Sequence, residues 1–135
     1  MKILLVEDSK FLRLATGRAL IRAGYEMSFA GDGDEALLMA AEKLPDLILL
    51  DMMLPKMSGP DVLKALKKEP ETARIPVVVL TGLSQTNAER LRGDGAYAFL
   101  TKTELALDQG AEPLLAALRK VFKEIPGAPT ATTAR

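Results

Sequence analysis

The chain contains no cysteine and no histidine among its 135 residues. Without cysteine, disulfide bonds, thiolate chemistry and cysteine-ligated metal sites are all excluded. Without histidine, the chain lacks the commonest general base and the commonest ligand of transition metals. Any metal that binds here is therefore expected to be a hard cation held by oxygen atoms.

The chain also lacks an excess of charge of either sign, because 18 basic residues balance 18 acidic ones. The composition as a whole thus gives no argument for binding to nucleic acid or to a membrane. The apolar runs are far shorter than the ~20 residues that span a bilayer. Because the first predicted strand begins almost at the amino terminus, there is no room for a signal peptide, and we expect a cytoplasmic protein.

The remaining composition is that of one globular domain. Apolar residues make up 48% of the chain, and at this length folding buries roughly two-thirds of the unfolded surface. From residue 126 onward the sequence is small, polar and proline-bearing, which is typical of a disordered tail or a linker. We predict one domain over residues 1–125 and a tail over residues 126–135.

Four short apolar runs each end at a polar residue that can do chemistry. Continuous apolar runs are typical of strands buried on both faces, as in parallel sheets. If all four strands point the same way, their carboxyl ends bring three carboxylates, a hydroxyl and an ammonium to the edge where open α/β sheets bind ligands. The runs are residues 3–6 before Glu7 and Asp8, 47–50 before Asp51, 77–80 before Thr81, and 96–100 before Thr101 and Lys102.

Stretches with helical spacing separate these runs. In residues 9–23, small and apolar side chains recur at steps of three and four and predict a buried helix face. This face comprises Leu12, Ala15, Ala19 and Ala23, and the basic residues expected in solvent are Lys10, Arg13, Arg18 and Arg22. Further helices are predicted over residues 34–43, 60–68, 84–92 and 112–124, and a weaker strand over residues 26–30. Pro70 is expected to close the third helix.

Five strands alternating with five helices predict an α/β fold, a doubly wound parallel sheet with helices on both faces. The residues themselves do not determine the strand order. The short chain nevertheless favours a five-stranded, flavodoxin-like (βα)5 sheet in the order 2-1-3-4-5 over the six-stranded dinucleotide-binding arrangement.

Glu7, Asp8 and Asp51 are the acidic residues expected to meet at one sheet edge. Carboxylates ~4 Å apart repel one another by about 1 to 4 kcal/mol per pair, so the cluster must shift a pKa, recruit a cation or attract Lys102. Oxygen ligands in an open cleft suit Mg²⁺. The Glu7–Asp8 pair alone is equally compatible with a solvated strand end and a helix cap.

Asp51 also has two interpretations. A carboxylate can act as a nucleophile and form an acyl phosphate. With Mg²⁺ and an ammonium nearby, the charge on an incoming phosphoryl group is stabilised without any acid or base, which suits a chain that lacks histidine. An aspartate after a buried strand is by itself more often a turn former, and Thr81 and Lys102 are unremarkable singly. Only the combination of an acid pair, a single acid, a hydroxyl and a lysine, in that order along the chain, favours phosphoryl transfer.

The sequence resembles the receiver domain of bacterial two-component response regulators over roughly residues 2–124. Five segments carry this resemblance in the family's order, which makes it far more specific than any single motif. They are residues 3–9 (ILLVEDS), 31–37 (GDGDEAL), 45–59 (PDLILLDMMLPKMSG), 75–82 (IPVVVLTG) and 95–102 (GAYAFLTK).

The resemblance implies a phosphoacceptor and a metal site. Asp51 would accept a phosphoryl group from a histidine kinase or a phosphotransfer protein. Mg²⁺ would be held by Glu7, Asp8, Asp51 and the main-chain carbonyl of Met53. The chain would be a signalling domain that catalyses only its own phosphorylation and dephosphorylation.

The resemblance also implies a switch. Thr81 would hydrogen-bond one phosphoryl oxygen and Lys102 would pair with another, while Phe99 would move inward as Thr81 shifts. The surface made by the helix after Thr81, the last strand and the last helix would then change its preference for a downstream protein or a fused output domain. A homodimer formed on phosphorylation is compatible with this, and no nucleic acid or membrane contact is implied.

The chain departs from the family pattern at several positions. Glu7 stands where many relatives have aspartate, Gly82 where alanine is frequent, and Phe99 where tyrosine is often found. Thr103 replaces the usual proline after Lys102. Because a cis bond before a residue other than proline costs about 2.5 to 4 kcal/mol, a trans bond is favoured there, and Lys102 would then be aimed differently. Residues 103–113 also form a longer connection than usual.

Three other functions share part of this sequence pattern. An acid-nucleophile phosphatase needs a second acid two residues after Asp51, where this chain has Met53. A flavin carrier of similar fold needs a loop that cradles phosphate after the first strand, where Glu7 and Asp8 would repel it. An interaction module that signals without phosphorylation keeps the same fold and stays open as the alternative.

Overall fold

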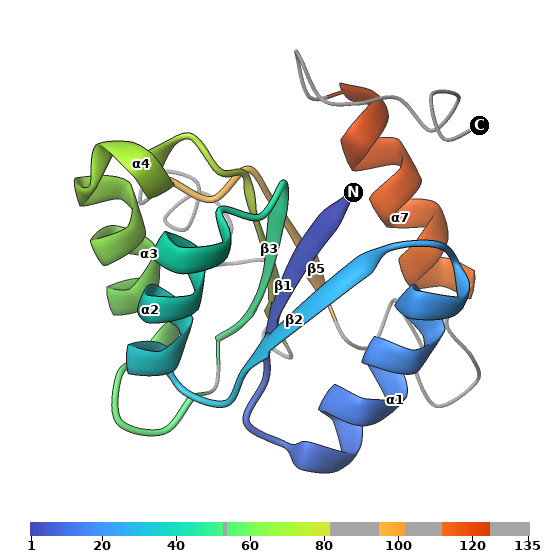
Figure 1. Cartoon of the computed structure of the whole chain (residues 1–135), viewed down its shortest axis with the longest axis horizontal. Coiled ribbons are helices and arrows are strands. Elements are labelled where there is room, and N and C mark those ends of the chain that lie inside the picture. The colour runs from blue at the N-terminus through green and yellow to red at the C-terminus, as the bar shows by residue number, and fades with distance from the viewer. Residues whose placement is uncertain (53, 82–94, 102–111, 125–135) are drawn as a thin grey trace.

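The computed structural model describes residues 1–52, 54–81, 95–101 and 112–124, in which five parallel strands lie between two layers of helices (Figure 1). The strands are β1 (Lys2–Val6), β2 (Glu26–Ala30), β3 (Leu47–Asp51), β4 (Val77–Thr81) and β5 (Ala98–Thr101). Their order in the sheet is β2-β1-β3-β4-β5, and each neighbouring pair is parallel. The predicted fold class and strand order are confirmed.

The helices are α1 (Lys10–Arg22), α2 (Gly33–Lys43), α3 (Gly59–Lys68), α4 (Pro70–Ala73) and α7 (Glu112–Glu124). Apart from α4, they match the predicted ranges to within one residue at each end. The predicted helix over residues 84–92, residues 103–111 of the long connection and the predicted tail lie outside the described residues. Within the part that is described, no helix is both long and apolar enough to cross a bilayer.

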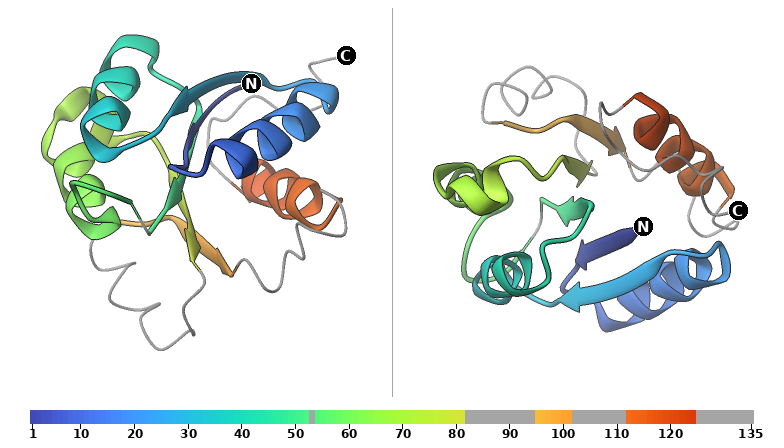
Figure 2. Two further views of the ribbon diagram at one scale, coloured as in Figure 1. Left: turned by 90° about the horizontal axis from the view of Figure 1, so that it is seen from below. Right: turned by 45° about the horizontal axis from the view of Figure 1, so that its top comes forward.

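The central strands are buried on both faces, as their continuous apolar sequences predict. Residues 3–6 and 47–51 are each at most 1% exposed. On one side of the sheet α2 and α3 cover a core that includes Leu4, Ile48 and Leu50. On the other side α1 and α7 cover a core that includes Ile3 and Leu49, and Figure 2 shows these two helix layers apart.

Pro70 does not merely close a helix, as the sequence analysis expected. Helix α3 ends at Lys68, but Pro70 then begins the short helix α4. Proline suits the first helical position because it has no N–H to leave unpaired there and its φ is already near the helical value. The Thr72 hydroxyl donates to the carbonyl of Leu66 at 2.6 Å and thereby ties α4 to α3.

The predicted buried face of α1 is wrong in part, since Leu12 and Ala19 are only half-buried. Ala15 and Ala23 are exposed, and a β carbon on Gly17 would lie 2.6 Å from the Phe29 ring. Glycine therefore permits the close approach of α1 to β2, and the approach through Gly17 rotates the helix away from the predicted face. The buried residues are Thr16, Gly17 and Leu20, while the large apolar residues left at the surface are Phe11 (78% exposed), Leu14 (48%) and Ile21 (56%).

Candidate functional site

The carboxyl ends of β1 and β3 lie side by side at one edge of the sheet. Val6 pairs with Leu50 in the register of these two strands, so Glu7 and Asp51 follow at the same level. Glu7 is 4% exposed and Asp51 is 1% exposed, whereas Asp8 lies at the surface. One carboxylate oxygen from each of the three acids lies within 4.8 Å of the others. The structure thus brings together the three acids that the sequence analysis expected to meet.

The geometry of this acid cluster suits a hard divalent cation. At such separations each pair of carboxylates repels by about 1 to 4 kcal/mol, and the repulsion grows where the surroundings exclude water. Two of the three residues are buried and one is exposed. Their carboxylate oxygens match the ligands that Mg²⁺ prefers, and this ion usually keeps several waters as its other ligands. Among the described residues, this is the one group of three or more acids with such spacing.

Glu7 is fixed by both its main chain and its side chain. Its N–H donates to the carbonyl of Ala30 at 3.0 Å, which continues the hydrogen bonding between β1 and β2. Its Oε2 accepts from the N–H of Ser9 at 3.2 Å. Ser9 in turn caps α1, because its hydroxyl accepts from the N–H of Leu12 at 3.3 Å. The start of α1 therefore helps to orient the first carboxylate of the cluster.

Arg13 is a polar residue of the site that the sequence analysis missed. It was expected in solvent, but it is half-buried, and its Nη1 donates to the main-chain carbonyl of Glu7 at 2.8 Å. Arg13 lies four residues after the cap Ser9 and four before the buried Gly17, which places it on the inward side of the helix. That spacing is the signal by which Arg13 could have been found.

The chain after Asp51 is held at both ends of a short loop. The N–H of Met52 donates to the carbonyl of Leu80 at 3.1 Å, and the N–H of Gly59 donates to the carbonyl of Met52 at 3.3 Å. A β carbon on Gly59 would lie 2.7 Å from the Cα of Met52, so only glycine allows this loop to close so tightly. Met53, which the resemblance assigns to the metal site, lies outside the described residues.

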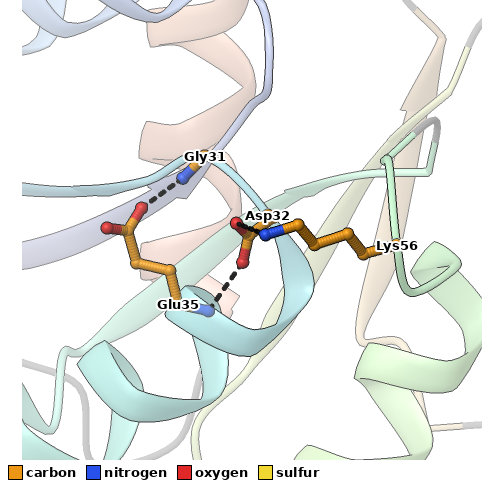
Figure 3. A network of polar contacts seen from close by, with 4 residues as sticks. All are labelled: Gly31, Asp32, Glu35 and Lys56. Carbon is orange, nitrogen blue, oxygen red and sulfur yellow. Dashed lines mark hydrogen bonds and ion pairs between the residues drawn. The ribbon is translucent and has the colours of Figure 1, made fainter.

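A polar network joins the loop after β2 to the loop after β3 (Figure 3). Glu35 Oε1 accepts from the N–H of Gly31 at 2.6 Å, and the Asp32 carboxylate caps α2 by accepting from the N–H of Glu35 at 2.9 Å. Lys56 Nζ lies 3.5 Å from Asp32 Oδ2. The pKa of Asp32 is lowered, chiefly by the hydrogen bond from the Glu35 N–H. The opposing effect of burial comes next, and the charge of Lys56 adds a smaller lowering.

Two further predicted site residues, Thr81 and Phe99, lie in β4 and β5. Leu80 pairs with Asp51, so Thr81 ends β4 one position beyond the level of the acid. Phe99 lies in β5 opposite Val79, and its half-buried side chain packs against the core beneath α2 and α3. Lys102 and the Lys102–Thr103 bond lie outside the described residues.

Comparisons with known proteins agree on one family. The sequence model of the response regulator receiver domain matches residues 3–110. The chain is 46% identical over 104 residues to the response regulator PleD of Caulobacter vibrioides, an alignment that covers 75% of this chain and 22% of PleD. The chain thus spans less than a quarter of that curated relative.

Solved structures of similar proteins share the fold. The chemotaxis protein CheY4 of Vibrio cholerae is 31% identical and superposes with a TM-score of 0.79, covering 89% of this chain and 97% of CheY4. The Mn²⁺-bound form of the response regulator Rcp1 is 29% identical with a TM-score of 0.76, covering 96% of this chain and 99% of Rcp1. A divalent ion therefore accompanies this fold in at least one similar protein.

Proposed function

Because this chain belongs to the family of response regulator receiver domains, we propose that it accepts a phosphoryl group on Asp51 from a phosphohistidine. The donor would be a histidine kinase or a phosphotransfer protein. The observation that carries this proposal is the acid cluster: Asp51 ends the central strand β3, and its carboxylate lies with those of Glu7 and Asp8 within 4.8 Å. The surroundings match the needs of phosphoryl transfer, since such transfer depends on positioning and charge stabilisation.

The reaction needs only one nucleophile from this chain. A carboxylate oxygen of Asp51 attacks the phosphorus, the bond between phosphorus and the donor's imidazole nitrogen breaks, and the imidazole leaves with the bonding electrons. The product is an acyl phosphate. Glu7, Asp8, Asp51 and the main-chain carbonyl of Met53 would hold Mg²⁺, which when bound supplies positive charge to offset that of the phosphoryl oxygens.

Thr81 and Lys102 would recognise the transferred group. The hydroxyl of Thr81 would donate to one phosphoryl oxygen, and the ammonium of Lys102 would pair with another. The main chain supports the first assignment, because Thr81 ends the strand next to the one that carries Asp51. Thr81 would draw Phe99 inward as it follows the phosphoryl group.

Phosphorylation would act by shifting the equilibrium between two conformations of the domain, rather than by creating a single new contact. Phosphorylation adds charge and strong hydrogen-bond acceptors at the sheet edge. The surface made by the segment after Thr81, by β5 and by α7 would then favour a different partner, either a separate protein or a fused output domain. Because the chain spans only 22% of PleD, a receiver joined to further sequence fits at least one relative.

The donor would meet an apolar surface beside the acids. Phe11 and Leu14 of α1 are 78% and 48% exposed, and Phe11 lies three residues after Asp8. We expect a donor that brings its phosphohistidine to Asp51 to cover Phe11, since exposed apolar patches mark sites of contact with other proteins.

The proposal predicts uptake of a phosphoryl group that depends on a divalent ion. Incubation of the protein with acetyl phosphate and Mg²⁺ is expected to add one phosphoryl group, because the small donor needs no docking surface. Intact-mass spectrometry measures the modified fraction. With excess chelator in place of Mg²⁺ the modified fraction should fall at least about tenfold, as loss of the metal charge removes several kcal/mol of transition-state stabilisation. Equal uptake with and without the ion would refute the metal site.

A further inference from the structure

Arg13 makes a contact at the acid cluster that the phosphoacceptor chemistry does not use. Its Nη1 donates to the main-chain carbonyl oxygen of Glu7 at 2.8 Å. That carbonyl belongs to the peptide unit that joins Glu7 to Asp8, so the arginine is bonded to the link between two of the three acids. The orientation of this peptide determines where the Asp8 side chain leaves the main chain.

The Glu7–Asp8 peptide lies just beyond the end of β1. The N–H of Glu7 is bound to Ala30 and its carboxylate to the N–H of Ser9, as described above. These two bonds fix the side of Glu7 that faces β2 and the start of α1. The bond from Arg13 fixes the carbonyl on the side that leads to Asp8, which is the exposed member of the cluster.

The guanidinium of Arg13 is itself confined. A β carbon on Gly31 would lie 3.1 Å from Arg13 Nη1 and 3.7 Å from Glu35 Oε1. Glu35 holds this loop by accepting from the N–H of Gly31 (Figure 3). Arg13 therefore lies between the end of β1 and the loop after β2. On the loop side its guanidinium lies against Gly31, which has no side chain.

We propose that Arg13 is a positioning residue of the cation site, which acts through the Glu7 carbonyl to hold Glu7 and Asp8 in the geometry that one divalent ion requires. This inference rests on the proposed function. The proposal predicts the direction in which Mg²⁺ affinity changes when Arg13 is removed. If Arg13 acted only as a positive charge near the ion, its removal would strengthen ion binding. A positioning role predicts that its removal weakens binding, as loss of the groups that orient metal ligands generally does.

Magnesium titrations of the full chain at pH 7, followed by calorimetry, test this direction. Arg13→Gln is expected to weaken Mg²⁺ binding by about tenfold. The matched control is Arg18→Gln, which removes the same charge from an exposed position of the same helix and is expected to change affinity less than about twofold because its charge is screened. Arg13→Lys keeps the charge and has a shorter donor. Its Mg²⁺ affinity should lie between those of Arg13→Gln and the wild type.

A second readout needs no metal. In the absence of Mg²⁺, the ¹³C resonance of the Glu7 carbonyl and the amide resonance of Asp8 should shift in Arg13→Gln and stay unchanged in Arg18→Gln. If Arg13→Gln does not fold, the comparison of Arg13→Lys with the wild type provides both measurements. Unchanged or tighter Mg²⁺ binding in Arg13→Gln would overturn the inference. Absence of Mg²⁺ binding by the wild type would instead contradict the proposed function, and this inference with it.

Discussion

Replacing Asp51 with asparagine is expected to abolish phosphoryl uptake from acetyl phosphate. The amide has nearly the shape of the carboxylate, but its oxygen carries no full negative charge and cannot form a stable acyl phosphate. Folding should survive the change, because the variant removes one of three mutually repelling charges at a position that is 1% exposed. Circular dichroism would verify the fold, and intact-mass spectrometry would measure the uptake.

The control for Asp51→Asn is Asp61→Asn, which neutralises an exposed aspartate in the first turn of α3. Uptake by this control should equal that of the wild type. Phosphorylation of Asp51→Asn at the wild-type level would show that another residue is the acceptor. If neither Asp51→Asn nor the wild type takes up the group, while a partner binds both equally, the chain is the phosphorylation-independent interaction module.

A core substitution in β3 is expected to have the largest effect on stability. Leu49 is 0% exposed and lies in the central strand, between Leu5 of β1 and Val78 of β4. Truncation of such a leucine to alanine removes buried methyl groups and leaves a cavity, which costs about 3 kcal/mol. That is a large part of the 5 to 15 kcal/mol by which domains are typically stable. Urea denaturation of Leu49→Ala measures the loss.

Leu38→Ala is the matched control, since Leu38 is 61% exposed on α2. It makes the same chemical change at the surface and should alter the free energy of unfolding by no more than about 0.5 kcal/mol. Similar losses for the two variants would mean that the sheet does not bury β3 on the face covered by α1 and α7. The burial of β3 matters for function, because the strand carries Asp51 at its end.

The strands and the acid cluster follow from the sequence because one physical signal determines both. A continuous apolar run such as residues 47–50 has a low free energy only when both its faces are covered, which favours a parallel sheet. Parallel strands then place the residues after the runs at one edge. Glu7 and Asp51 accordingly meet there, as predicted.

The buried face of α1 could not be predicted in the same way. Apolar residues lie on more than one side of this helix, so their spacing does not identify a single face. The close approach of Gly17 to Phe29 determines the rotation instead, and it depends on a residue in another element. The same rotation brings Arg13 to the Glu7 carbonyl. Because the spacing of apolar residues does not reveal this rotation, the sequence predicts Arg13 in solvent.

The roles of Met53 and Lys102 stay predictions, because both residues lie outside the part of the chain that the structure describes. The short helix α4 was missed for a different reason. Pro70 can end one helix or begin another, and the sequence does not distinguish these uses when the two helices are separated by a single residue.

The most direct test of the account is a magnesium titration of the ¹⁵N-labelled wild-type protein followed by NMR. We expect saturable shifts of the amide resonances of Glu7, Asp8 and Asp51 with one ion bound per chain. Asp46, which precedes β3 at the opposite edge of the sheet, should not respond. Shifts spread equally over surface acids, or none at the three clustered residues, would contradict the claim that they form a divalent-cation site beside the phosphoacceptor.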